Sequence, residues 1–345
     1  MRIAVIPFAL HAQDTTQVYP WRLSYFPYVT TSPNNGFMLV ARAIGFRQSR
    51  WDDRVSLHDA VAIDAGYSAK NAWLLRVRGD FPRIADGWRL QVIGQASYET
   101  ELEGGTASTR QTGSIEVTRR VAGPASIAVR GDVLHATLEA FTSMTPNGFQ
   151  ASEARGRIAL VLDYRDREYD TRKGALLQGG GFVGSSNGMK GWYALASGWV
   201  PLDESTRITA RAGVRIGTHM TSEGVRTMPA WEDNFVLGGG PESNRALPIA
   251  WKPNAKMMLW SAEIRHDVFT FPGGALGVLA FVDANREYCD CQYLTDGPGF
   301  VEPKEWTVGP GGGIALRLLR NAILTATIAR AEGATRVYVS SGWSW

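Results

Sequence analysis

Apolar and polar residues alternate along most of this chain, in segments of about eight to twelve residues that end at turn signals. The clearest segment, residues 207–216, places small and aliphatic side chains on one face, namely Ile208, Ala210, Ala212, Val214 and Ile216. The opposite face carries Arg207, Thr209, Arg211, Gly213 and Arg215. A period of two is typical of a β-strand, and no stretch has a convincing helical period. The pattern therefore predicts an all-β protein.

The same alternation recurs towards the C-terminus, at residues 158–165, 258–265, 314–318 and 335–345. The last of these segments places four residues on one face, Val337, Val339, Trp343 and Trp345. Counting from Trp21 to Trp345 gives about sixteen strands, at roughly twenty residues for each strand and its connector. An even number of strands allows the first strand to pair with the last, which removes both free edges of the sheet.

Alternation alone fits two architectures, a soluble β-sandwich and a membrane β-barrel. In a sandwich the polar faces meet water, whereas in a barrel the apolar faces meet lipid and the polar faces line the lumen. The apolar faces here end in aromatic residues, and the polar faces hold isolated charges. That arrangement is typical of a lipid-facing band with aromatic girdles. We therefore predict a transmembrane antiparallel β-barrel over residues 21–345, and a soluble binding module remains the alternative.

The composition agrees with this fold. The chain has 345 residues, including 38 Gly, 12 Trp and 11 Tyr, and abundant Gly and aromatics without helical periodicity favour β-structure. No apolar run approaches the roughly 18 residues of a transmembrane helix. The mean hydropathy of −0.15 suits a barrel, because only alternate residues face lipid. The net charge is +3 without basic clusters, so we expect no nucleic-acid partner.

The connectors differ in length, and the difference assigns them to two sides of a membrane. Short turns at residues 122–124, 201–205 and 320–321 are expected to be periplasmic, and longer connectors near residues 141–154, 217–256 and 288–305 extracellular. The second of these, about 40 residues long, is far longer than an ordinary connection. Its stretch 234–248 is rich in Gly and Pro but too apolar for a solvated tail. We predict that this loop folds back into the barrel lumen.

Several short motifs occur in an order that resembles a known family. They are Phe26-Pro27 with Ser32-Pro33 and Gly36, Leu162-Asp-Tyr-Arg-Asp166 with Lys173-Gly174, Phe235-Val-Leu-Gly-Gly239 with Asn244-Arg245, Phe281-Val-Asp-Ala-Asn285, and the closing strands from Gly311 to Trp345. The ordered set is similar to the BamA/TamA-like surface-antigen outer-membrane barrel superfamily, which includes two-partner-secretion transporters of the FhaC type. The chain departs from the family pattern where Ala246 and Asn285 replace glycine. Ala lacks the freedom of Gly at positive φ, so the loop tip is expected to differ in shape.

The resemblance implies a bacterial outer-membrane location and a role in protein insertion or translocation. It implies a lateral seam between the first strand, near residues 21–31, and the last, residues 335–345. The partners implied are outer-membrane lipid, client outer-membrane proteins, and periplasmic or lipoprotein components. Family members usually carry periplasmic POTRA domains, but strands here begin by about residue 21, so we expect a barrel without them. A passive or gated pore without assembly activity is the alternative function.

The resemblance also implies an anchor for the long loop. In the family, the loop arginine reaches carboxylates on the lumen wall, and Arg245 holds that position here. Alternation along the neighbouring strands directs Glu263, Phe281 and Asp283 inward. A guanidinium between two carboxylates is well suited to bidentate pairing. The alternative is that these are unrelated solvated charges.

Five further arginines are predicted to line the lumen, Arg207, Arg211, Arg215, Arg265 and Arg317. One interpretation is a pore with a preference for anions. The other is a packed interior in which Asp163 and the acidic residues of the loops pair with these arginines.

The sequence offers no constellation for catalysis, so we expect neither an enzyme nor a cofactor or metal site. Gly-x-Ser-x-Gly is absent, and the adjacent His266 and Asp267 point to opposite faces of a strand. Cys289 and Cys291 are too few to close a zinc site. Residues 1–20 resemble the end of a secretory signal or a periplasmic segment, because an apolar stretch is followed by the small residue Ala12.

Overall fold

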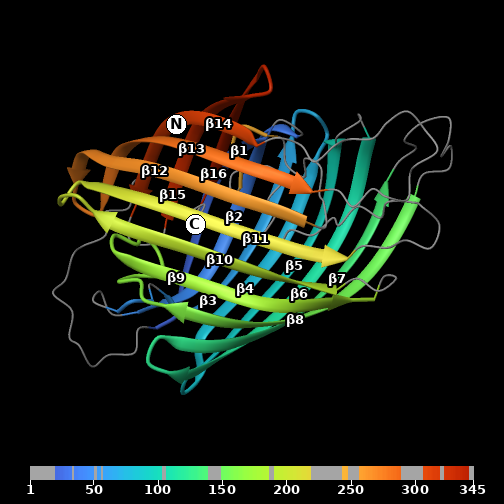
Figure 1. Ribbon diagram of the computed structural model, residues 1–345, viewed down its shortest axis with the longest axis horizontal. Helices are drawn as coiled ribbons and strands as arrows, with labels where there is room; N and C mark the ends of the chain where they lie inside the picture. The colour runs from blue at the N-terminus through green and yellow to red at the C-terminus, as the bar shows by residue number, and fades with distance from the viewer. Residues whose placement is uncertain are drawn as a thin grey trace.

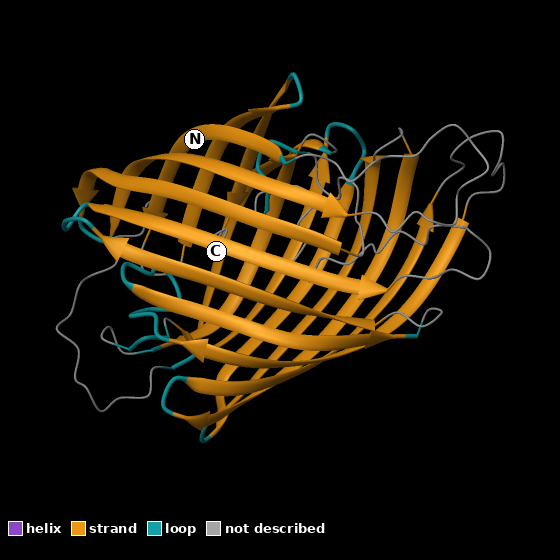
Figure 2. Cartoon of the chain, viewed as in Figure 1, coloured by secondary structure: helices purple, strands orange, loops and turns teal. Residues whose placement is uncertain are grey.

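The computed structural model describes residues 20–32, 35–49, 53–55, 57–102, 106–138, 149–185, 190–218, 243–247, 256–288, 306–318 and 322–341. These residues form sixteen β-strands without a helix (Figure 2). Among them, no helix is long and apolar enough to cross a bilayer. The strands are β1 (Arg22–Ser32), β2 (Gly36–Gln48), β3 (Leu57–Ser68), β4 (Trp73–Ala85), β5 (Trp88–Leu102), β6 (Thr106–Ala122), β7 (Ala125–Leu138), β8 (Phe149–Asp163), β9 (Gly174–Gly184), β10 (Lys190–Pro201), β11 (Thr206–Thr218), β12 (Lys256–Phe271), β13 (Gly274–Tyr288), β14 (Thr307–Leu318), β15 (Ala322–Ala331) and β16 (Ala334–Ser341).

The strands close into one antiparallel barrel in which each strand pairs with its sequence neighbours (Figure 1). β1 pairs with β16, so the ring is complete. The predicted fold is therefore confirmed, including the count of about sixteen strands and the pairing of the first strand with the last. The last strand, β16, ends at Ser341. The predicted C-terminal aromatics, Trp343 and Trp345, lie outside the described residues.

The two faces of the wall follow the alternation of the sequence. On β12, Trp260 and Ile264 point outward with exposed fractions of 45% and 43%, whereas Leu259 and Glu263 point inward and are buried. Large apolar side chains are exposed on the outer face of strands all around the ring. A monomeric soluble protein does not expose so much contiguous apolar surface, whereas a barrel wall in contact with lipid does.

Glycines in the wall permit close strand contacts. A Cβ on Gly180 of β9 would lie 2.2 Å from the carbonyl oxygen of Ile158, and one on Gly313 of β14 would lie 2.1 Å from that of Ala326. Both distances are far below van der Waals contact. A larger residue at either position would therefore push neighbouring strands apart.

The barrel has a short-turn end and a long-connector end. The short-turn end holds the tight turns β6–β7, β10–β11 and β12–β13, as the connector lengths predict. In the β10–β11 turn, the Asp203 carboxylate accepts the backbone N–H groups of Ser205 and Thr206 at 2.7 Å and 2.6 Å. These bonds lower the pKa of Asp203 below its ordinary value. The long connectors leave the opposite end, and most of their residues lie outside the described part of the chain.

Candidate functional site

Residues 243–247 of the long β11–β12 connector lie against the inner face of the barrel. Asn244, Ala246 and Leu247 are fully buried there. Their contacts are with inward-facing groups of β12, β13, β14 and β16. We call these five residues the loop tip. The rest of the connector, including the motif residues Phe235 to Gly239, lies outside the described residues.

Arg245 is held by two carboxylates of the wall. Its Nε and Nη2 donate to the two oxygens of Asp283 on β13 at 2.8 Å and 2.9 Å, a bidentate pair. Its backbone N–H donates to the same carboxylate at 3.0 Å, and its Nη1 donates to Glu263 on β12. The three residues are 2%, 0% and 3% exposed, so the charges are almost completely removed from water.

The two strands position this cluster through their register. Glu263 lies opposite Phe281, and Ser261 lies opposite Asp283, so all four side chains share the inner face. The Arg245 guanidinium lies 3.4 Å from the centroid of the Phe281 ring, a cation–π contact. The Ser261 hydroxyl donates to Asp283 at 2.5 Å. The structure thus brings together Arg245, Glu263, Asp283 and Phe281.

The loop tip also contacts the last strand of the barrel. Arg336 Nη1 on β16 donates to the Ala246 carbonyl at 2.6 Å, and the Tyr338 hydroxyl donates to the Leu247 carbonyl at 2.5 Å. Neither residue was among the site residues predicted from the sequence. The alternation of the last strand could have identified them. Val337 and Val339 lie on its outer face, so Arg336 and Tyr338 must lie on the inner one. The tip therefore joins the β12–β13 wall to β16.

Asn244 completes the connection on the side of β14. Its Nδ2 donates to the Asn285 Oδ1 at 2.9 Å and to the Thr307 carbonyl at 3.1 Å. Its own Oδ1 accepts the Ala246 N–H at 3.0 Å, which fixes the turn of the tip. Asn285 stands where the family motif Phe-x-Asp-x-Gly has glycine. Its side chain therefore hydrogen-bonds directly to the loop tip.

Ala246 fits the tip because a glycine lies opposite it. The described non-Gly residues with positive φ do not include Ala246, so the tip does not need glycine at this position. A Cβ on Gly309 of β14 would lie 2.3 Å from the Ala246 Cβ and 2.9 Å from the Asn244 Oδ1. The space for the Ala246 methyl is thus supplied by Gly309.

We expect Gly309→Ala to displace the loop tip. Overpacking of this kind costs about 1–3 kcal/mol, which corresponds to about a tenfold rise in the displaced population. Trypsin cleaves after exposed arginines, so mass spectrometry should detect about tenfold faster cleavage after Arg245. Gly94→Ala is the matched control, because a Cβ there has no atom within 4 Å. Equal cleavage in the two variants would contradict this account of Gly309.

Arg207, Arg265 and Arg317, which were predicted to line the lumen, pair with carboxylates. Arg207 Nη1 donates to Asp170 at 2.8 Å, Arg265 Nε donates to Glu263, and Arg317 donates to both Asp170 and Asp267. Such pairs are typical of a packed, salt-bridged interior.

The other two arginines, Arg211 and Arg215, are buried on the inner face of β11. The Arg215 guanidinium lies 4.9 Å from the centroid of the Phe182 ring. Asp163, expected as a partner for the lumen arginines, pairs with Arg165 at 2.9 Å and with Arg54. Its position at the end of β8 directs it to its own connector.

Known proteins resemble this chain in structure but not in sequence. No protein-family model and no curated protein matches it. The structure of BamA from Haemophilus ducreyi lacking POTRA domains 1–3 has a TM-score of 0.64 at 12% identity, over 93% of this chain and 70% of that one. CdiB from Escherichia coli has a TM-score of 0.63 at 11% identity, over 95% and 64% of the two chains. CdiB from Acinetobacter baumannii has a TM-score of 0.55 at 10% identity, over 94% and 66%.

These likenesses confirm, at the level of the fold, the resemblance that the motifs indicated. The chain has the fold of the BamA and CdiB barrels, and it spans less than two thirds of each CdiB chain.

Proposed function

We propose that this chain is a barrel of the Gram-negative outer membrane that inserts or translocates proteins through a seam between β1 and β16. The observation that carries the proposal is the contact of the first strand with the last within the described residues. Their described residues share a single register pair, Thr31 with Val339, and a bond from the Thr30 hydroxyl to the Val339 carbonyl at 2.7 Å.

This contact matters because backbone groups form the interface between strands. If the contact between β1 and β16 opens, their N–H and C=O groups become available to another strand. An extended client segment could add to such an edge by β-augmentation, with main-chain hydrogen bonds as the source of affinity. The exposed apolar faces of β1, including Leu23 and Tyr25, would let the added strand meet lipid immediately.

The loop tip supports the proposal because it contacts β16. Arg245 fixes the tip to β12 and β13, and the tip carbonyls accept the bonds of Arg336 and Tyr338. The last strand is therefore connected to β12 and β13 through the loop tip. We propose that the Arg245 anchor sets how far the seam opens.

Depletion of the protein tests the proposal. We expect the levels of other outer-membrane barrel proteins to fall, while soluble periplasmic proteins keep their levels, because only the former need insertion. Quantitative mass spectrometry of membrane fractions measures both classes, and re-expression of the wild-type chain should restore the first. Unchanged levels of all outer-membrane proteins would contradict the proposed function.

The alternative function is a passive or gated pore. The observation in its favour is the set of buried arginines on the inner face of β8 and β11, namely Arg155, Arg157, Arg211 and Arg215. Arg155 and Arg157 pair with Asp132 and Glu116 at 3.6 Å and 3.4 Å, so an anion preference would come from the clustering of arginines and not from unpaired charges. A steady anion-selective current across a planar bilayer, together with unchanged levels of other barrel proteins, would favour this function.

A further inference from the structure

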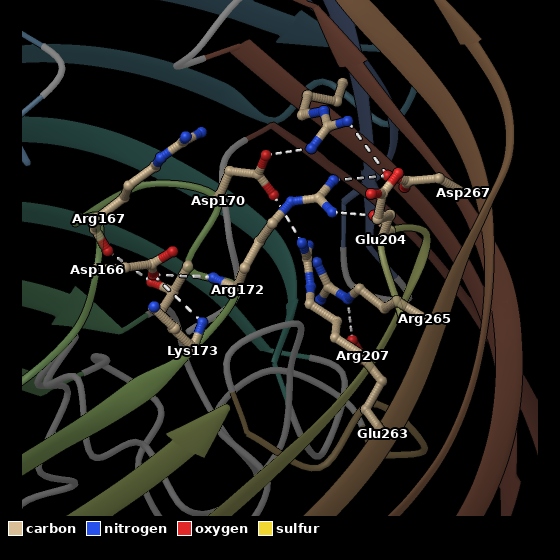
Figure 3. A network of polar contacts seen from close by, with 12 residues as sticks. Asp166, Arg167, Asp170, Arg172, Lys173, Glu204, Arg207, Glu263, Arg265 and Asp267 are labelled. Atoms are coloured by element: carbon tan, nitrogen blue, oxygen red, sulfur yellow. Dashed lines mark hydrogen bonds and ion pairs between the residues drawn. The ribbon is translucent and has the colours of Figure 1, made fainter. Parts of the chain in front are cut away.

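The β8–β9 connector, residues 164–173, lies at the short-turn end of the barrel, and Figure 3 shows part of its network of polar contacts. We call it the strap. On one side it contacts the first half of the chain. The Glu168 carboxylate accepts Nη1 of Arg89 on β5 at 2.9 Å and 3.0 Å, and the Glu168 N–H donates to the Arg54 carbonyl at 3.0 Å.

On its other side the strap contacts the second half of the chain. The Asp170 carboxylate accepts Arg207 on β11 at 2.8 Å and also Arg317 on β14. Arg172 Nη2 donates to Asp267 on β12 at 2.9 Å, and its Nη1 donates to the Glu204 carbonyl. Figure 3 shows Asp170 and Arg172 of the strap pointing towards Arg207 and Asp267 of the wall.

The two sets of contacts place the strap across the opening. β5 and β14 lie nearly opposite each other in the ring. Glu168 and Asp170 are only two residues apart, yet they bind Arg89 and Arg317 of these two strands. A connector that followed the rim from β8 to β9 could not reach both walls.

The strap is also folded within itself. The Asp166 carboxylate accepts the N–H groups of Arg172 and Lys173 at 3.0 Å and 3.3 Å, and the Thr171 hydroxyl donates to the Arg167 carbonyl at 2.8 Å. Asp170 has a φ of 52°, in the left-handed region that Asp tolerates better than most residues. Burial raises the pKa of the Tyr169 phenol, which is part of the strap. The strap therefore has a defined conformation that its own hydrogen bonds stabilise.

Ion pairs hold this unit to the wall, and several are partly open to solvent. The side chains of Arg89, Arg172 and Arg317 are 22%, 30% and 17% exposed. Partly exposed pairs contribute little each, so the contacts can be broken one after another. The Asp170 carboxylate is buried and shared by two arginines, so it is the contact whose loss matters most.

We propose that the strap is an ion-pair latch that closes the short-turn end of the barrel, and that its release opens the lumen to that side. This inference goes beyond the proposed function, because a closed lumen is a property of the barrel whether or not it inserts proteins. It assigns Asp170 as the central latch residue, with Arg207 and Arg317 as its partners.

Conductance across a planar bilayer tests the latch with Asp170→Asn. Removing the charge leaves two arginines without their shared carboxylate, and we expect about a tenfold longer open time than in the wild type. Asp203→Asn is the control, because it removes one charge from the same end, where Asp203 accepts N–H groups of its own turn. Equal open times in the two variants and the wild type would overturn the proposal.

A cross-link supplies an independent test that does not rely on a weakened barrel. Asp170→Cys and Arg317→Cys, with Cys289→Ser and Cys291→Ser, permit a short bis-thiosulfonate reagent to join the strap to β14. We expect low conductance in the bridged protein and high conductance after reduction in the same bilayer. Equal current before and after reduction would overturn the proposal. The proteome test of the proposed function is separate, so either idea can fail alone.

Discussion

Arg245→Ala is expected to lower the free energy of unfolding of the barrel by about 3–5 kcal/mol, because two buried carboxylates would lose their partner. Asp283 would keep the Ser261 hydroxyl and Glu263 would keep Arg265, but the bidentate pair and the cation–π contact would be lost. Equilibrium unfolding by urea in phospholipid vesicles, followed by tryptophan fluorescence, measures the change.

Two variants bracket this result. Arg245→Lys keeps the charge but cannot form the planar bidentate pair, so we expect an intermediate loss. Arg83→Ala removes an arginine whose side chain is 47% exposed and lies 3.1 Å from Asp53, and we expect a loss below about 1 kcal/mol. If Arg245→Ala were no less stable than Arg83→Ala, the cluster would not anchor the loop tip.

The wall of the barrel could be predicted from sequence because each strand carries its own evidence. In residues 207–216, every second side chain faces the lumen, and Arg207, Arg211 and Arg215 are all buried as the period of two requires. The count of strands followed from repeating this local test. The inward direction of Glu263 and Asp283 followed from it as well.

The partners across the lumen could not be predicted in this way. Alternation determines the face of a side chain but not which distant charge it meets, and a connector has no period at all. Asp170 lies in such a connector, and its partner Arg317 is 147 residues further along the chain. Asp163, on a regular strand, was the more conspicuous acidic residue but pairs locally with Arg165.

The tip of the long loop shows a second limit of the sequence. Ala246 stands where the family motif has glycine, and this difference predicted a different shape for the tip. In the structure, Gly309 leaves room for the Ala246 methyl group. The compensating residue is on β14, and a single sequence does not relate the two positions. Pairs of this kind become visible only when the strands are placed side by side.

A disulfide between Thr31→Cys and Val339→Cys is expected to abolish the insertion of client proteins. These residues are the described register pair of β1 and β16, and directly opposed Cα atoms in antiparallel strands are about 4.5–5.5 Å apart, a spacing that a disulfide accepts. The natural cysteines are first replaced, by Cys289→Ser and Cys291→Ser, so that the disulfide across the seam is the only one that can form. The measurement is the folding of a denatured small barrel protein into vesicles that contain the variant.

Val339 offers a matched control, because it lies between two strands. Its partner on β15 is Ala326, so Ala326→Cys with Val339→Cys introduces the same bond one strand away from the seam. We expect this control to insert clients at the wild-type rate, and the seam disulfide to lose activity until a reductant restores it. If the oxidised seam variant remained as active as the control, clients would not pass between β1 and β16. The conductance results would then decide whether the strap serves a pore instead, because a gated pore opens along the barrel axis and tolerates a locked seam.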